Sequence, residues 1–214
     1  MGGSFGSDVS LADLDGDGDT DAFVANNGGQ PNKVWLNNLD VVKKQACDNT
    51  VPNNLVVNGS FEKPVMVYKG YSSERAIEGW ELVAGPFIEL NSLYITYPNL
   101  TNVYDGSQFV DLDSSNATTK ISQKIATQPG ERYKLTFAFT GSGNSTTEHD
   151  KLNVSWGLEL VEALDKVDSD IAWEVKTYNL TAKSTETVLS FDNLNEVANS
   201  YGTHLDGVSL NLCQ

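Results

Sequence analysis

Hydrophobic and polar positions alternate along most of this chain, in short runs that turn residues separate. The clearest run carries Tyr133, Leu135, Phe137 and Phe139 at every second position. Strict alternation is typical of half-buried antiparallel strands. Ile121 and Ile125 mark a further strand, and other runs share the pattern at 152–156, 173–175, 189–191 and 208–212. About ten strands are predicted in this part of the chain.

One segment fits a second interpretation, because residues 158–168, GLELVEALDKV, also have the spacing of a short helix. Regular strands joined by long polar loops nevertheless favour a β-sandwich or jelly roll over alternating strands and helices. The predicted fold class is therefore all-β.

The start of the chain has a different amino-acid composition. Residues 1–45 are rich in Gly, Asp and Asn, with short apolar pieces at 9–11, 22–25 and 33–36. Periodicity is lost around residue 50, where turn-forming residues gather. The pattern predicts an N-terminal region over 1–45, a linker over 46–54 and the main β-domain over 55–214.

Charge narrows the range of partners. The chain has 29 acidic and 14 basic side chains, a formal net charge of −15. Such a field repels phosphate backbones and anionic lipids, so we expect no nucleic-acid partner. No apolar run reaches the roughly 18 residues of a membrane span, and the first ten residues lack the features of an export signal, so no membrane insertion is expected.

The strongest chemical signal is an aspartate loop in the N-terminal region. A carboxylate occupies every second position over nine residues, at Asp13, Asp15, Asp17, Asp19 and Asp21. Converging carboxylates repel one another strongly, and Ca²⁺ relieves this with six to eight oxygen ligands. The spacing matches the first nine positions of an EF-hand loop, but Val24 replaces the expected glutamate. The pattern therefore predicts a strand-loop-strand calcium site; the alternative is a solvated acidic turn.

Residues 7–38 resemble one FG-GAP or VCBS-type repeat, the blade unit of integrin-like β-propellers. The resemblance implies a structural calcium held by the same five aspartates. A propeller needs several blades and only one repeat is present, so the repeat is either part of a truncated propeller or a separate appendage.

Residues 55–214 resemble galactose-binding-like jelly rolls, which occur in carbohydrate-binding modules and in a plant cell-wall family catalogued as a domain of unknown function. The resemblance lies in NLVVNGSFE at 54–62, GWE at 79–81, DGSQFVDL at 105–112, ISQ at 121–123, YKLTF at 133–137 and HLDGVSL at 204–210. It implies a jelly-roll β-sandwich and a second structural calcium, with Glu62 and Asp206 as ligands. The alternative is that both are exposed turn residues.

Sugar binding needs flat apolar faces for the ring and polar side chains for its hydroxyls. Aromatic candidates outside clear core positions are Tyr94, Tyr97, Tyr104, Tyr201 and Trp80, whereas Trp156 and Trp173 follow strand alternation and are predicted to pack in the core. Asn102, Asp105 and Gln108 share a central loop with Tyr104, and this loop is the predicted ligand site.

The two cysteines, Cys47 and Cys213, fit no zinc or redox motif. A disulfide between them is the simplest use and would indicate an extracellular or cell-surface location; the alternative is two buried thiols. Candidate glycosylation sites are the asparagines of six Asn-x-Ser/Thr sequences, Asn58, Asn99, Asn116, Asn144, Asn153 and Asn179.

Catalysis is not expected. Gly2-Gly3-Ser4-Phe5-Gly6 matches a nucleophile-elbow pattern but lacks the flanking strand and helix, and His149 and His204 form no zinc motif. The favoured hypothesis is a calcium-stabilised extracellular module that binds a polysaccharide or glycoconjugate. The rival is a structural surface protein that assembles with neighbouring copies of itself through its N-terminal repeat.

Overall fold

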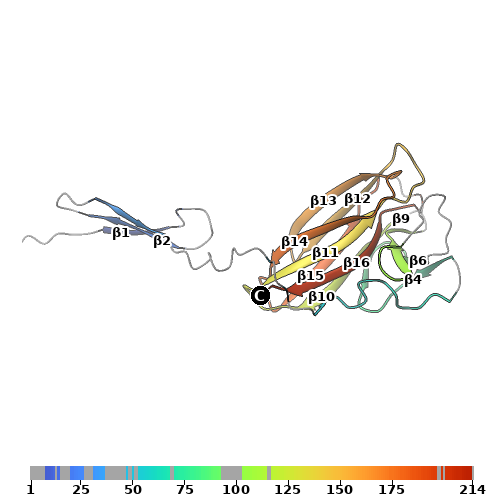
Figure 1. The fold of residues 1–214 in the computed structure, drawn as a ribbon, viewed down its shortest axis with the longest axis horizontal. Helices are drawn as coiled ribbons and strands as arrows, with labels where there is room; N and C mark the ends of the chain where they lie inside the picture. Colours follow the sequence, from blue (N-terminus) through green and yellow to red (C-terminus); the bar gives the residue numbers. More distant parts are fainter. Residues whose placement is uncertain are drawn as a thin grey trace, which may run out of the picture. The chain divides into compact units, whose positions relative to one another are not determined.

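The computed structural model describes residues 8–12, 14, 20–26, 31–36, 47, 50, 53–67, 70–92, 103–114, 117–196, 199 and 201–213. The chain divides into two compact units, Met1–Asp48 and Asn49–Gln214. Every regular element in these described residues is a β-strand (Figure 1). They contain no helix long and apolar enough to cross a membrane.

The larger unit is a sandwich of two antiparallel sheets, which confirms the all-β jelly-roll prediction. The five-stranded sheet has the order β13 (Glu159–Val167), β12 (His149–Trp156), β15 (Glu186–Asn193), β10 (Lys120–Ala126) and β5 (Glu81–Ala84). The six-stranded sheet has the order β14 (Glu174–Thr181), β11 (Arg132–Thr140), β16 (His204–Leu212), β7 (Gln108–Asp111), β6 (Ile88–Ser92) and β4 (Tyr71–Glu74). A short hairpin pairs β8 (Asp113–Ser114) with β9 (Ala117–Thr118).

Alternation along the strands builds the core between the sheets. Tyr133, Leu135, Phe137 and Phe139 of β11 are all buried, as the sequence predicts. They meet side chains of the other sheet, including Phe191, whose ring packs edge-on against Phe137 at 5.1 Å. Burying these side chains contributes roughly 1.5 to 3 kcal/mol each.

The segment with two interpretations is a strand. Residues 159–167 form β13 and pair with β12 in antiparallel register from His149 opposite Val167 to Trp156 opposite Glu159. Only Leu164 and Lys166 of β13 are buried. Pairing with β12 therefore decides the conformation that local spacing left open.

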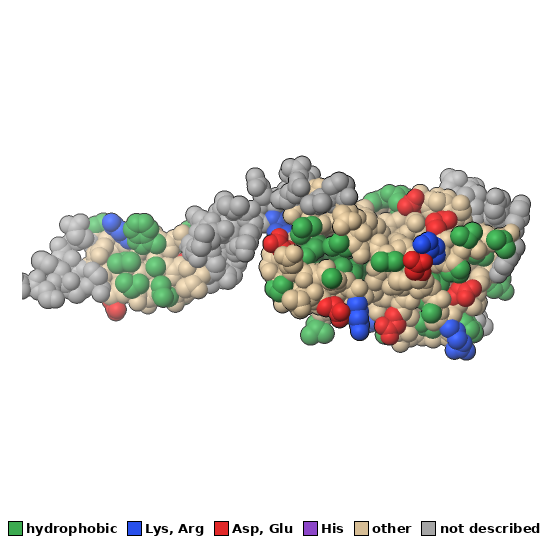
Figure 2. All heavy atoms as spheres, turned by 90° about the horizontal axis from the view of Figure 1, so that it is seen from below, with side chains coloured by type: hydrophobic (Ala, Val, Ile, Leu, Met, Phe, Trp, Pro, Cys, Tyr) green, Lys and Arg blue, Asp and Glu red, His purple; other side chains and the backbone are tan. Residues whose placement is uncertain are grey.

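The smaller unit contains one sheet, β1 (Asp8–Ala12), β2 (Asp21–Ala25) and β3 (Lys33–Trp35), in that order. Its register aligns Leu11, Ala22 and Trp35 on one face, together with Val9 and Val24. Val9, Leu11 and Trp35 are 55%, 68% and 62% exposed. Figure 2 shows hydrophobic side chains gathered on the surface of this unit.

Both cysteines are disulfide-bonded, and since the chain has only two, Cys47 is joined to Cys213. The predicted disulfide is confirmed. It fastens the end of β16 to the segment before the sandwich, where Thr50 bridges to Cys213.

Candidate ligand-binding site

The aspartate loop of the N-terminal unit is described only in part. Asp13, Asp15, Asp17 and Asp19 lie outside the described residues, so their calcium role stays a prediction. Asp21 begins β2, is 1% exposed, and accepts a hydrogen bond from the Leu14 amide through Oδ2 at 2.7 Å. This buried carboxylate therefore contacts the backbone of Leu14.

Glu62 and Asp206 are far apart in the sequence but clamp the same loop. Glu62 Oε1 accepts hydrogen bonds from the amides of Ser107 and Gln108 at 2.6 and 2.8 Å. Asp206 Oδ2 accepts from the amides of Tyr104 and Asp105 at 3.0 and 2.8 Å. Neither is a free turn residue, because each holds one end of the 104–108 loop.

The clamp supplies two carboxylates, which are ligands that a hard cation such as Ca²⁺ prefers. Asp206 is fully buried, and burial raises its pKa to about 8 although three backbone amides oppose the shift. A bound cation would lower that pKa. No group of three or more His, Cys, Asp or Glu side chains that could hold a metal occurs in the described part of the chain. A metal here would depend on these two carboxylates and on carbonyl oxygens, which Ca²⁺ accepts.

The predicted ligand loop keeps only some of its candidates at the surface. Tyr104 is 45% exposed, and Asp105 is exposed. Gln108 is 2% exposed; its Nε2 donates to the carbonyls of Phe61 and Pro64, and its Oε1 accepts from the Met66 amide. Gln108 therefore fastens the 61–66 segment and presents no group to a sugar in this structure. Asn102 lies outside the described residues.

The other aromatic candidates divide between core and surface. Trp80 and Trp156 are buried in the core, so Trp80 offers no face to a ligand. Trp173 was predicted to be a core residue, and that prediction is wrong. It is half-buried and contacts Tyr104 at 6.3 Å and Phe109 at 5.9 Å between ring centroids. It precedes β14, so the sheet does not enclose it. Tyr94 and Tyr97 lie outside the described residues.

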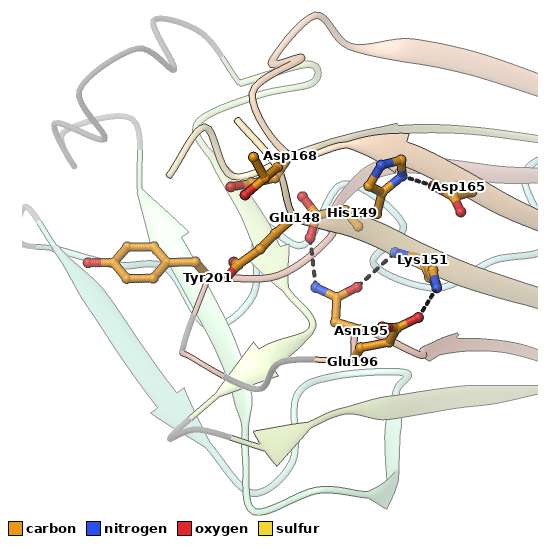
Figure 3. Close-up of a pocket in the computed structure, with 10 residues that line it drawn as sticks. Glu148, His149, Lys151, Asp165, Asp168, Asn195, Glu196 and Tyr201 are labelled. Atoms are coloured by element: carbon orange, nitrogen blue, oxygen red, sulfur yellow. Dashed lines mark hydrogen bonds and ion pairs between the residues drawn. The ribbon is translucent and has the colours of Figure 1, made fainter. Parts of the chain in front are cut away.

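Tyr201 lies at a pocket that opens at one end of the sandwich. The cavity has a volume of about 320 Å³ and is lined from three segments of the chain. Its lining residues are Thr147, Glu148, His149, Asp150, Lys151, Asp165, Asp168, Asn195, Glu196 and Tyr201. Figure 3 shows the polar side chains converging from the strand ends while Tyr201 stands apart from them. We call this cavity the rim pocket.

Hydrogen bonds hold the wall of the rim pocket in place. Asn195 Oδ1 accepts from the Lys151 amide at 2.7 Å, and its Nδ2 donates to Asp150 Oδ1 at 2.7 Å (Figure 3). Lys151 Nζ pairs with Glu196 at 2.6 Å, and His149 pairs with Asp165. The hydrogen bond to Lys151 lowers the pKa of Glu196. The wall is thus preorganised and presents both donors and acceptors.

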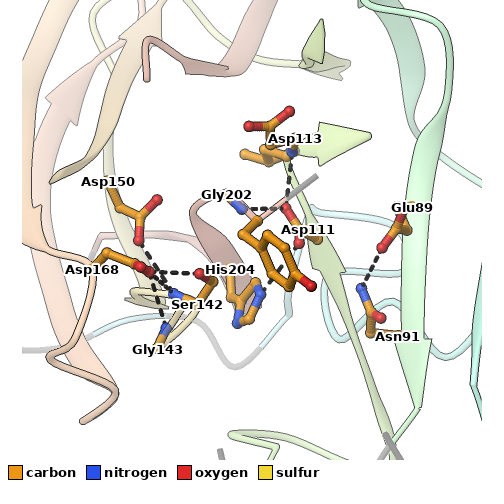
Figure 4. A network of polar contacts seen from close by, with 12 residues as sticks. Glu89, Asn91, Asp111, Asp113, Ser142, Gly143, Asp150, Asp168, Gly202 and His204 are labelled. Carbon is orange, nitrogen blue, oxygen red and sulfur yellow. Dashed lines mark hydrogen bonds and ion pairs between the residues drawn. The ribbon is translucent and has the colours of Figure 1, made fainter. Parts of the chain in front are cut away.

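Two aspartates share the floor of the rim pocket. Asp168 Oδ1 accepts from the Ser142 amide, the Ser142 hydroxyl and the Gly143 amide at 2.9, 2.5 and 2.9 Å, as Figure 4 shows. Asp150 is 1% exposed, and burial raises its pKa to about 8, with its neighbour Asp168 adding to the shift. Asp150 therefore keeps its proton near neutral pH.

A buried acidic layer lies on the outer face of the six-stranded sheet, at β6, β7 and β16. Register places Glu89, Asp111 and His204 side by side across these strands. His204 Nε2 is 3.4 Å from Asp111 Oδ2, and Glu89 meets Asn91 (Figure 4). Burial, followed by repulsion from Asp111, raises the pKa of Glu89 to about 8. Asn91 Oδ1, Ser114 Oγ and Thr203 Oγ1 are buried and make no hydrogen bond within the described residues.

Asn199 connects the acidic layer to the rim pocket. Its Nδ2 donates to Glu148 Oε2 at 2.9 Å, and its amide donates to Asp113 Oδ2 at 3.2 Å. Its Oδ1 accepts from the Tyr201 amide at 3.0 Å. Sequence reasoning named Tyr201 but missed Glu148, Lys151 and Asn195, because isolated polar residues carry no spacing signal.

The sequons differ in accessibility. Asn144 and Asn179 are exposed, and Asn153 is half-buried on β12. Asn58 uses its side chain internally, since Nδ2 donates to the carbonyls of Lys63 and Glu78 and Oδ1 accepts from the Lys63 amide. Asn99 and Asn116 lie outside the described residues.

The fold and the disulfide define a class, that of disulfide-closed jelly-roll β-domains. Residues 54–211 match the family described as "Protein of unknown function (DUF642)". The chain belongs to this family.

One curated relative and several solved structures are similar to the chain. Halomucin of Haloquadratum walsbyi is 25% identical over 166 residues, which are 73% of this chain and 2% of that protein. The chain therefore spans only a small part of that relative. A structure titled "Family 16 Carbohydrate Binding Module-2" has 16% identity and a TM-score of 0.45, covering 73% of this chain and 99% of its own. "TmCBM61 in complex with beta-1,4-galactotriose" has 16% identity and a TM-score of 0.42, covering 74% and 97%.

Proposed function

We propose that the sandwich is a non-catalytic carbohydrate-binding domain of an extracellular or cell-surface protein, stabilised by calcium. The observation that carries the proposal is the rim pocket. Its volume of about 320 Å³ lies within the usual range for small-ligand sites, about 300 to 1,000 Å³. The proposal rests on this cavity and not on the similarities above.

The groups around the rim pocket suit a polyhydroxylated ligand. Carboxylates and the Asn195 amide can accept or donate hydrogen bonds to sugar hydroxyls, and Tyr201, 39% exposed, offers an aromatic face. Because the polar side chains are already hydrogen-bonded to one another, ordering them on binding costs little. The Cys47–Cys213 disulfide supports the extracellular location.

Calcium is proposed at two places. The N-terminal loop carries five alternating aspartates, of which Asp21 is buried and directed toward Leu14. The clamp of Glu62 and Asp206 brings two carboxylates to one loop. When bound, calcium would neutralise these carboxylates and tie their loops to the strands.

Glycan binding by the full chain tests the proposal. We expect retention on at least one polysaccharide in affinity electrophoresis, and a roughly three- to tenfold weaker affinity for Tyr201→Ala. Tyr104→Ala is the matched comparison, because Tyr104 is similarly exposed but belongs to the loop predicted from sequence. If Tyr104→Ala loses glycan binding while Tyr201→Ala binds as tightly as the parent, the site lies at the 104–108 loop and not at the rim pocket. Absence of binding to any glycan would refute the proposal.

Self-assembly is the second candidate, and one observation favours it. The three-stranded sheet exposes Val9, Leu11 and Trp35 on one face, an arrangement that a neighbouring copy could cover. Light scattering with and without calcium tests this: a concentration-dependent oligomer that Trp35→Ser abolishes supports assembly, and a monomer in both conditions opposes it.

A further inference from the structure

The charge of the rim pocket indicates which class of glycan it would bind. This inference rests on the carbohydrate-binding function proposed above. Five of the ten lining residues are acidic, Glu148, Asp150, Asp165, Asp168 and Glu196, and two are basic. Both basic side chains are already engaged, Lys151 with Glu196 and His149 with Asp165. Even with the Asp150 proton retained, the lining keeps an excess of negative charge.

Part of this negative charge remains accessible at the pocket mouth. The side chains of Glu196 and Asp165 are 82% and 53% exposed, and the ion pair of each engages only one carboxylate oxygen. Glu148 uses Oε2 for Asn199. The second oxygen of each carboxylate can therefore accept a hydrogen bond from an incoming donor.

The acidic layer is linked to the rim pocket by hydrogen bonds through Asn199. Asp111 and Asp113 are fully buried, and Asn199 joins Asp113 to Glu148 through one residue. His204, beside Asp111, is the basic side chain that the described residues place in this layer.

We propose that the rim pocket selects glycans with free amino groups over neutral sugars, and rejects uronic acids. A protonated amine gains attraction from Glu148, Asp165 and Glu196 and donates hydrogen bonds to their open oxygens. A uronate carboxylate meets like charge and few open donors. N-acetylation removes the amine charge, so an acetylated sugar ranks between the two.

Three oligosaccharides of equal length test the selectivity in the full chain. They are a glucosamine oligomer with free amines, its N-acetylated form and a galacturonic acid oligomer, each titrated calorimetrically at about pH 6. The expected order of affinity is free amine, then N-acetyl, then uronate. Raising the salt from about 50 to about 300 mM should shrink the difference, because the exposed charges are screened.

Charge-neutralising variants separate the pocket from the net charge of the chain. Glu148→Gln with Glu196→Gln should reduce the preference for free amine over N-acetyl by roughly two- to fivefold for each carboxylate. The amide that replaces the Glu148 carboxylate keeps an oxygen for Asn199, and Glu196 is at the surface, so thermal unfolding should be little changed. The matched control is Glu131→Gln with Glu159→Gln. Both positions are exposed and lie away from the rim pocket: Glu131 precedes β11, and Glu159 begins β13 opposite Trp156, the last residue of β12. The control variant has the same net charge and should keep the preference.

The outcomes distinguish the two proposals. Binding of neutral glycans without a preference for amines overturns the selectivity alone, as does an equal loss in the control variant. Binding to none of the three oligomers and to no polysaccharide overturns both proposals.

Discussion

Glu89 is the residue at which burial and charge conflict most directly. It is 6% exposed, faces Asp111 across β6 and β7, and its pKa is raised to about 8 from 4.5. A proton on Glu89 lets the strand pair form without two adjacent buried charges. The same argument applies to Asp150 beside Asp168.

Stability should therefore fall as the pH rises. Because the folded-state pKa of Glu89 lies above its unfolded value, its contribution is complete below about pH 4.5 and is lost as the pH passes through about 8. Glu89→Gln removes this titration. The variant should be more stable than the parent above pH 8, by roughly 2 to 5 kcal/mol at most, with the difference shrinking toward pH 5. Denaturant unfolding with EDTA across this range measures it; parallel pH curves would contradict the prediction.

The backbone of Val208 comes so close to Gly59 that no side chain fits at this position. A Cβ at this position would overlap the carbonyl of Val208, and the Gly59 carbonyl accepts from the Val208 amide at 2.8 Å. Gly59→Ala should cost at least about 2 kcal/mol of unfolding free energy, because backbone must move. Gly130→Ala is the control: its φ of 84° disfavours alanine, but nothing lies within 4 Å, so about 1 kcal/mol is expected. Equal losses in urea unfolding would show that crowding at Gly59 is unimportant.

At the scale of elements, β16 connects the acidic layer, the loop clamp and the disulfide. It carries His204 in the acidic layer and Asp206 in the loop clamp, and it pairs with both β11 and β7. Its last residues lead to Cys213, which bridges to Thr50 and bonds to Cys47. The disulfide therefore secures the strand that carries the Asp206 end of the loop clamp and His204 of the acidic layer.

Removing the disulfide should weaken the sandwich without abolishing its core. Cys47→Ser with Cys213→Ser opens a loop that spans nearly the whole domain, a loss of roughly 4 to 5 kcal/mol on the chain-entropy model. Urea unfolding of the variant and of the parent, with and without reductant, measures the loss. If reductant breaks the disulfide of the parent but leaves its unfolding free energy unchanged, the prediction is wrong.

At the scale of the whole molecule, the acidic composition predicts a response to calcium. The full chain should gain thermal stability when calcium is added and lose it in EDTA, by about 2.7 kcal/mol at a hundredfold excess over Kd. Asp206→Asn should reduce the response of the sandwich, and Asp17→Asn that of the N-terminal unit. If calcium does not change the unfolding temperature of the parent, both proposed calcium sites are refuted.

Several features could be predicted from sequence because they depend on local periodicity. Alternation at Tyr133, Leu135, Phe137 and Phe139 marked β11 because a strand places every second side chain on one face. The same reasoning failed at Trp173, which alternates with Val175 but lies before the strand begins. It left 158–168 open, since β13 follows from pairing with β12.

The sequence by itself determined the all-β class, the strand pattern and the strong negative charge, because these follow from side-chain period and composition. Only the tertiary structure decided that Glu62 and Asp206 clamp one loop and that Gln108 is enclosed. It also assembled the rim pocket from Glu148, Asn195 and Tyr201. Residues tens of positions apart become neighbours only when strands pair and two sheets close over a shared core, and no local pattern encodes that distance.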